Sequence, residues 1–153
     1  MRVWRLCQAG YAKEALSGEG GMRASARWHD QGTRVVYTSS TLSLAALELL
    51  VRTDRAHAPP GLVAVEIDLP SSLDIERATR SRLKAGWDAY PAPAFTRAFG
   101  SNWVAAMRTA VLEVPSAVIP RESNFLLNPA HPHFGRIRVV GRSPFSFDSR
   151  LLT

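Results

Sequence analysis

The most regular alternation of hydrophobic and polar positions in the chain runs from Leu62 to Leu69. Every second position is apolar, namely Val63, Val65, Ile67 and Leu69. This period of two predicts a strand of a sheet with one buried face. Runs of β-branched and aromatic residues predict further strands at 1–6, 34–38, 136–140 and 145–147, and an extended segment at 116–119.

Two helices are expected from hydroxyl caps followed by apolar residues at helical spacing. The first begins after Ser39-Ser40-Thr41, continues through the Leu- and Ala-rich run and ends near Arg52–Thr53. The second begins at Ser101. Its apolar face is expected to comprise Trp103, Ala106, Met107 and Ala110.

The remaining segments are rich in residues that favour turns. Glycines at 18, 20 and 21 predict a loop, 70–93 predicts a short helix plus loop, and the prolines within 124–134 predict irregular structure. Several short strands with two or so helices indicate the α+β class. We therefore expect one compact domain over residues 1–153, with a mixed or antiparallel β core and flanking helices.

Composition is that of an ordinary folded protein, with 46% hydrophobic and 21% charged residues. The longest weakly polar stretch, Leu42–Val51, is too short to span a bilayer, and no secretory signal is visible at the N-terminus. Cys7 is the only cysteine, so no internal disulfide can form. These features favour a cytoplasmic protein without a membrane partner.

The net charge of +6 comes almost wholly from arginine, because only Lys13 and Lys84 among 19 cationic residues are lysine. Arginine grips carboxylates and phosphates in pairs, so an anionic ligand or acidic partner is one interpretation and codon bias is the other. The arginines are dispersed, which argues against a nucleic-acid-binding module but leaves it as the non-enzymatic alternative. His131 and His133 lack further ligands at a recognised spacing, so no metal site is expected.

Glu48 is the only charge within the apolar run 42–51. On a helix it shares a face with Leu44, Ala45 and Val51. Such a carboxylate is either held in a cleft for a purpose or exposed in an ordinary pair with Arg52, four residues on.

Arg27, Tyr37 and Glu48 lie on three successive predicted elements, with ten residues from Arg27 to Tyr37 and eleven from Tyr37 to Glu48. Each has an ordinary interpretation, a surface arginine beside Trp28 and a half-buried strand aromatic. Together, an arginine for phosphates, an aromatic for stacking and a carboxylate for positive charge suit a pyridine dinucleotide.

These residues fall into blocks that resemble the RES-domain family, named for Arg, Glu and Ser residues. The first block is Arg27-Trp28-His29, Gly32, Tyr37-Thr38-Ser39 and Leu44-Ala45-Ala46-Leu47-Glu48. A middle piece, 96–103, is similar to the family's segment ahead of its long helix. The last block comprises 114–120, Glu122, Asn124, Asn128-Pro129 and His131-Pro132. The sequence departs from the family at His29, where Asn is common, and at Ala26, where Gly is frequent.

The resemblance implies a fold similar to diphtheria-toxin-like ADP-ribosyltransferases, and the toxin half of a bacterial type II toxin–antitoxin pair. It implies that NAD⁺ is the substrate rather than a resident cofactor, and that the nicotinamide–ribose bond is cleaved. Water, phosphate or a protein target is the acceptor; in the last case the chain is an ADP-ribosyltransferase. The expected partner is an Xre-type antitoxin with a helix-turn-helix domain, through which alone DNA would be contacted. A homo-oligomer within that complex is compatible with the resemblance.

The resemblance also implies roles for individual residues. Glu48 would stabilise the ribosyl cation that forms as nicotinamide leaves, Tyr37 would confine the nicotinamide ring, and Arg27 would hold the pyrophosphate or ribose. Ser116 would donate a hydrogen bond within the site or order it, and Ser39 and Asn124 would support substrate binding.

Overall fold

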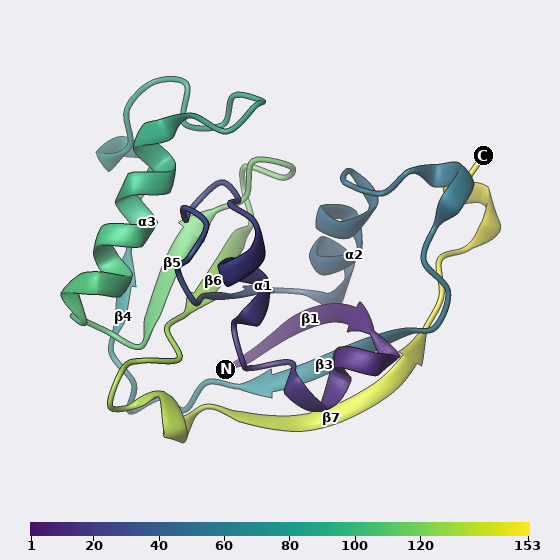
Figure 1. Ribbon diagram of the computed structural model, residues 1–153, viewed down its shortest axis with the longest axis horizontal. Coiled ribbons are helices and arrows are strands. Elements are labelled where there is room, and N and C mark those ends of the chain that lie inside the picture. The colour runs from purple at the N-terminus through teal and green to yellow at the C-terminus, as the bar shows by residue number, and fades with distance from the viewer.

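The computed structural model describes residues 1–153 and is built on a seven-stranded sheet of order β4-β5-β6-β2-β1-β3-β7 (Figure 1). The strands are β1 (Arg2–Gln8), β2 (Val36–Ser39), β3 (Leu62–Asp68), β4 (Ile75–Arg77), β5 (Val111–Pro115), β6 (Ser123–Leu127) and β7 (Arg138–Phe145). Only β4 and β5 pair in parallel, and all other neighbours are antiparallel. The expected α+β class with a mixed sheet is confirmed.

Three α-helices and five short 3₁₀ turns connect the strands. The helices are α1 (Glu19–Arg23), α2 (Leu42–Leu50) and α3 (Ala94–Ala106). The 3₁₀ turns are η1 (Ala9–Glu14), η2 (Arg55–His57), η3 (Arg80–Arg82), η4 (Phe134–Arg136) and η5 (Ser149–Leu151). No helix is long and apolar enough to cross a bilayer.

The sheet consists of two halves that are joined at a single residue pair. β1 meets β2 only at Trp4 and Ser39, whereas β1 pairs with β3 over its whole length. In Figure 1 the half β1-β3-β7 runs along the bottom of the molecule, and β5 and β6 rise from it beside α3. Helix α2 packs against both β1 and β2, and therefore lies where the two halves meet.

Two hydrophobic clusters hold this arrangement together. One cluster joins both halves of the sheet, since it contains Val3 and Ile67 from one half and Val36 and Phe125 from the other. The second lies under α3 and is built on three tryptophans, Trp28, Trp87 and Trp103. Burial of side chains this large supplies most of the favourable free energy of folding.

Helix α2 begins as its sequence predicts. The Thr41 hydroxyl accepts a hydrogen bond from the Leu44 N–H at 3.0 Å, which satisfies one of the free amides of the first turn. Leu44 and Ala45 are buried, while Val51, expected on the same face, is 61% exposed because the helix ends at Leu50.

The second predicted helix starts seven residues earlier than expected, at Ala94, so the expectation of a cap at Ser101 is wrong. Pro93 precedes the first turn, and Ser101 instead accepts a hydrogen bond from the Asp30 N–H at 2.9 Å. Gly100 permits close packing here, because a Cβ at this position would lie 1.8 Å from the Trp28 carbonyl oxygen. Of the predicted apolar face, Ala106 and Met107 are exposed.

Four other expectations were wrong in detail. Residues 116–119 form a turn, because the Ser116 hydroxyl accepts hydrogen bonds from the amides of residues 118 and 119. Residues 124–127 form the interior strand β6, where β2 and β5 supply hydrogen bonds on both sides. The glycine-rich loop contains α1, and 70–93 contains β4 and η3.

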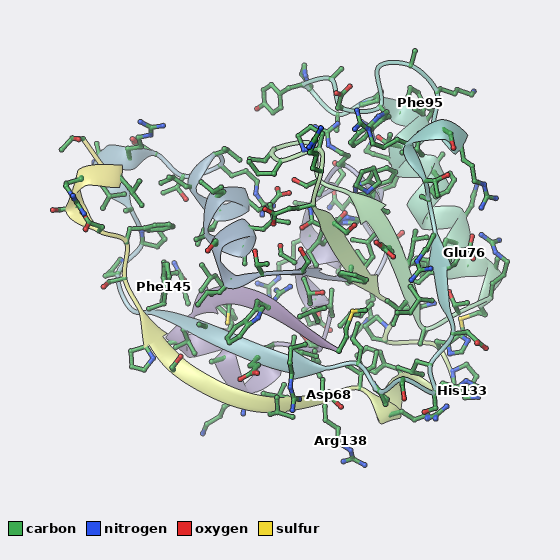
Figure 2. All side chains as sticks on the ribbon, turned by 180° about the vertical axis from the view of Figure 1, so that it is seen from behind. Asp68, Glu76, Phe95, His133, Arg138 and Phe145 are labelled. Carbon is green, nitrogen blue, oxygen red and sulfur yellow. The ribbon has the colours of Figure 1, made fainter.

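The two predicted closing strands are one strand, β7, which pairs with β3 along its length. Figure 2 shows Asp68 and Arg138, partners in that ladder, at one end of β7, with Phe145 toward the other end. Residues 146 and 147 lie beyond the strand. The register between the two strands shifts between Glu66, which pairs with Gly141, and Ile67, which pairs with Val139; Val140 is therefore the extra residue of a bulge in β7.

Candidate active site

Arg27 lies at the tip of a tight turn that precedes β2. The turn closes through reciprocal backbone hydrogen bonds between Ala26 and His29, at 3.1 and 3.4 Å. The Arg27 guanidinium donates through Nη1 to the carbonyl oxygens of Trp87 and Ala89, at 2.7 and 2.9 Å. Its Nε and Nη2 groups have no partner within the chain, so they remain able to donate to a ligand.

Tyr37 on β2 faces the cluster beneath α3 and is half-buried. Its hydroxyl accepts a hydrogen bond from the Trp28 N–H at 3.2 Å and lies 2.8 Å from Nδ1 of His29. Burial raises the pKa of Tyr37 well above its usual value, so the phenol is neutral under ordinary conditions. Its hydroxyl is engaged within the protein, and the ring is what it can offer a ligand.

Glu48 on α2 is held by one of its two carboxylate oxygens. Oε1 accepts a hydrogen bond from the Ser116 hydroxyl at 2.8 Å and another from the Asn124 amide at 2.6 Å. Oε2 accepts none from the chain. Arg52 does not pair with this carboxylate, and its Nε–H donates instead to the Glu48 backbone carbonyl at 2.9 Å. The structure thus provides a half-buried carboxylate with one fixed and one free oxygen.

The groups behind Glu48 are buried and fully engaged. The Ser39 hydroxyl donates to Oδ1 of Asn124 at 2.8 Å, which directs the Asn124 amide N–H toward the carboxylate. The Ser116 oxygen accepts from two backbone amides, so its proton is directed to Glu48. Because the side chains of Ser39, Ser116 and Asn124 are buried, they hold the carboxylate from behind.

The charges of Arg27 and Glu48 lie close enough to each other and to the Tyr37 phenol to affect the pKa values of Arg27 and Tyr37. Burial lowers the pKa of Arg27, and the nearby negative charge of Glu48 is the largest effect opposing that shift. The positive charges of Arg52 and Arg27 lower the pKa of Tyr37, against the larger effect of burial, and Glu48 raises it. The structure therefore brings these three residues into one electrostatic environment, with Ser39, Ser116 and Asn124 behind Glu48.

Sequence reasoning missed two parts of this site. His29 was noted only as a departure, yet it contacts the Tyr37 hydroxyl. Trp87 packs on Trp28, with ring centroids 6.2 Å apart, and its carbonyl binds Arg27. The available signal was that Trp87 is the only aromatic residue in the polar stretch 70–89.

Other features of the surface lie apart from this group. A hollow of about 160 Å³ is bordered by Arg77, Arg80 and Arg121. Arg27, Tyr37 and Glu48 do not line it. His131 and His133 have ring centroids 5.2 Å apart, but no group of three His, Cys, Asp or Glu side chains is placed to hold a metal ion.

Comparison with known proteins identifies the family to which the chain is similar. The family model described as the RES domain matches residues 2–148. A Prs ADP-ribosylating toxin of Sphingobium sp. (strain YBL2) is 37% identical over 153 residues, covering 97% of this chain and 95% of that protein. A protein named Toxin Res of Pseudomonas putida is 36% identical, covering 99% of each.

The fold has a solved counterpart as well. The crystal structure of the MbcT–MbcA toxin–antitoxin complex of M. tuberculosis contains a chain that matches with a TM-score of 0.74 at 17% identity. The match covers 99% of this chain and 86% of that one. That match shows the fold alone, whereas the family match over nearly the whole sequence and the similar toxin sequences show that this chain belongs to the RES-domain family.

Proposed function

We propose that this chain is the toxin of a bacterial type II toxin–antitoxin system and cleaves the nicotinamide–ribose bond of NAD⁺. The observation that carries the proposal is the Glu48 carboxylate, anchored through Oε1 and free at Oε2, in the same electrostatic environment as Arg27 and Tyr37. A fixed negative charge of this kind suits a reaction in which positive charge develops on the substrate.

Cleavage breaks the bond between the ribose anomeric carbon and the nicotinamide nitrogen. The electron pair of that bond leaves with nicotinamide, which becomes neutral, and the ribose acquires oxocarbenium-like character. Glu48 stabilises this cation through its free oxygen. Because Ser116 and Asn124 already orient the carboxylate, little reorganisation is needed as the charge forms.

Tyr37 and Arg27 position the groups of NAD⁺ on either side of the reacting ribose, the nicotinamide and the pyrophosphate. The Tyr37 hydroxyl is engaged by Trp28 and His29, so Tyr37 acts through its ring, which confines the nicotinamide. Arg27 uses Nη1 to hold the carbonyls of residues 87 and 89, and its free N–H groups bind the pyrophosphate by charge-assisted hydrogen bonds.

Ser116, Ser39 and Asn124 act through Glu48 rather than on the substrate. Their side chains are buried, and each is engaged in the hydrogen-bond network that ends at Oε1. We therefore assign them positioning roles. For Ser116 this is the hydrogen-bonding and ordering role that the family resemblance implied, and for Ser39 and Asn124 it replaces direct binding of the substrate.

A second candidate is transfer of ADP-ribose to a protein target. The name of the Sphingobium relative favours it, since that protein is described as an ADP-ribosylating toxin. The same residues would cleave the same bond, and a side chain of the target would replace water or phosphate as nucleophile. Both candidates act on NAD⁺ in the cytoplasm and need no further cofactor.

The proposed partner is an Xre-type antitoxin, supported by the fold shared with a chain of a toxin–antitoxin complex. A toxin of net charge +6 favours an acidic partner surface, which mainly accelerates association. We expect the antitoxin to cover the Arg27–Glu48 site.

Product analysis tests the proposal. Purified chain is incubated with NAD⁺ in phosphate-free buffer, in phosphate buffer, and with cell lysate, and products are identified by mass spectrometry. Free ADP-ribose indicates hydrolysis, its phosphorylated form indicates phosphorolysis, and a protein carrying ADP-ribose indicates transfer. Failure to release nicotinamide under all three conditions would contradict the proposal.

A further inference from the structure

His29 is a buried imidazole whose two nitrogens are both engaged. It is 3% exposed. Nε2 lies 2.8 Å from the Ala24 carbonyl oxygen, and Nδ1 lies 2.8 Å from the Tyr37 hydroxyl. A carbonyl oxygen only accepts hydrogen bonds, so Nε2 carries the proton. In the neutral ring Nδ1 is then the acceptor, and Tyr37 donates its hydroxyl proton to it.

We propose that His29 is a positioning residue for Tyr37, which it holds against the Arg27–Glu48 site by accepting a hydrogen bond from the Tyr37 hydroxyl at Nδ1. The functional part of this inference rests on the function proposed above. His29 itself needs no contact with the substrate.

The contact ties together two elements that carry site residues. His29 closes the turn that bears Arg27, and the Trp28 amide of that turn donates to the same Tyr37 oxygen from the other side. Tyr37 therefore both accepts and donates a hydrogen bond, which fixes the position of its hydroxyl at the end of the ring. Loss of the Nδ1 acceptor would leave the Tyr37 proton without a partner in a buried place, and the ring would shift to find one.

The link depends on the neutral form of His29. Protonation would place a second N–H at Nδ1 and remove the acceptor. The polar groups that face the imidazole are the Tyr37 hydroxyl from β2 and the Ala24 carbonyl; Asp30 is adjacent in sequence and pairs with Arg97 of α3 at 3.2 Å. Burial lowers the pKa of His29 below its usual 6.5, while Ala24 and Asp30 oppose that shift. The link is therefore intact at neutral pH, and it is lost only as the pH falls through this lowered pKa.

Two amide substitutions separate this role from that of a simple turn anchor. His29→Asn places its amide near the position of Nδ1 and can still accept from Tyr37, but it cannot also reach Ala24. His29→Gln extends one atom further and can still donate to Ala24, but it offers Tyr37 no acceptor. We expect the Gln variant to release nicotinamide on the order of 10- to 100-fold more slowly, as a misplaced site group does. The Asn variant should retain most of the activity and lose the acid limb of the pH profile.

A double-mutant cycle with Tyr37→Phe shows whether His29 acts through Tyr37. Once the hydroxyl is absent, His29→Gln should cause little further loss in either nicotinamide release or thermal stability. Gln more active than Asn, or additive losses in the cycle, would overturn the inference.

The ring nitrogens of His29 provide a test that needs no activity. In ¹⁵N NMR spectra at pH 7.5, Nε2 should be protonated and Nδ1 should not, and Tyr37→Phe should shift the Nδ1 signal. A protonated Nδ1 would overturn the inference. If the native chain released no nicotinamide, the proposed function would fail, while the NMR result and the stability cycle would still decide whether His29 positions Tyr37.

Discussion

Replacing Glu48 with Gln removes one charge from the site while keeping the shape of the side chain. Gln retains an acceptor oxygen where Oε1 now accepts from Ser116 and Asn124, at 2.8 and 2.6 Å. Each hydrogen bond to a carboxylate contributes about 1.5–3 kcal/mol, against about 0.5–1.5 kcal/mol for a neutral acceptor. The two weakened bonds cost about 2 kcal/mol together, and the smaller penalty for burying a neutral amide offsets part of that cost.

The effect on the reaction is expected to be much larger than the effect on stability. Losing one preorganised electrostatic contact at the transition state slows turnover by roughly 10²–10³-fold. The melting temperature should fall by no more than a few degrees, because about 1 kcal/mol corresponds to about 2–4 °C in a protein of this size. NAD⁺ loss and growth arrest should both disappear on expression of the variant.

The assay is nicotinamide release by purified protein, with thermal unfolding measured on the same samples. Glu66→Gln is the matched control, since Glu66 is a partly exposed carboxylate on β3 that pairs with Arg2. It should keep full activity. If Glu48→Gln were as active as the native chain, the charge at Oε2 would play no part in the reaction, and the proposed mechanism would be refuted.

Three further predictions concern the packing of α3 on Trp28, the ionisation of Tyr37 and the binding role of Arg27. Gly100→Ala should destabilise the protein by about 1–3 kcal/mol and reduce activity, because its Cβ would lie 1.8 Å from the Trp28 carbonyl oxygen. Gly20→Ala is the control, since the space around Gly20 is open, and it should stabilise the protein by up to about 1 kcal/mol. Equal shifts of the melting temperature in the two variants would contradict the packing argument. Tyr37 has a raised pKa, so its contribution to stability is complete below pH 10 and is lost as the pH rises above it; thermal unfolding of Tyr37→Phe should therefore show a weaker alkaline decline than the native chain. Arg27→Lys keeps the charge but loses the planar fork, and should raise the KM for NAD⁺ by roughly 10-fold, and an unchanged KM would exclude Arg27 from substrate binding.

The sequence predicted best where local chemistry decides the structure. The alternation at 62–69 became β3, and Thr41 caps α2, because period and capping depend on residues that are neighbours in the chain. It failed at α3, where Ser101 was expected to cap the helix, whereas both Gly100 and Ser101 lie inside it. Their roles are tertiary: Gly100 admits the Trp28 carbonyl and Ser101 binds the Asp30 amide.

The candidate site likewise has one part that could be predicted from the sequence and one part that could not. Family resemblance selected the residues Arg27, Tyr37 and Glu48, but not the hydrogen bonds that connect their surroundings. Asn124 was expected in an irregular segment, yet it lies in β6, where its amide bridges Ser39 and Glu48. Contacts between residues 76 and 85 positions apart leave no periodic pattern in the sequence.

The single ladder pair between Trp4 and Ser39 has a consequence for how the molecule opens. Side-chain packing, rather than backbone hydrogen bonding, holds the two halves of the sheet together, so hydrogen–deuterium exchange should resolve them as two cooperative units of different protection. Arg27 and Tyr37 belong to one unit, while Glu48 is on the helix that rests on both. A ligand that contacts Arg27 and Glu48 together would therefore add a connection between one half of the sheet and the helix that packs on both halves. Its binding should slow exchange in β1 and β3 as well as at the site, although no atom of the ligand touches those strands.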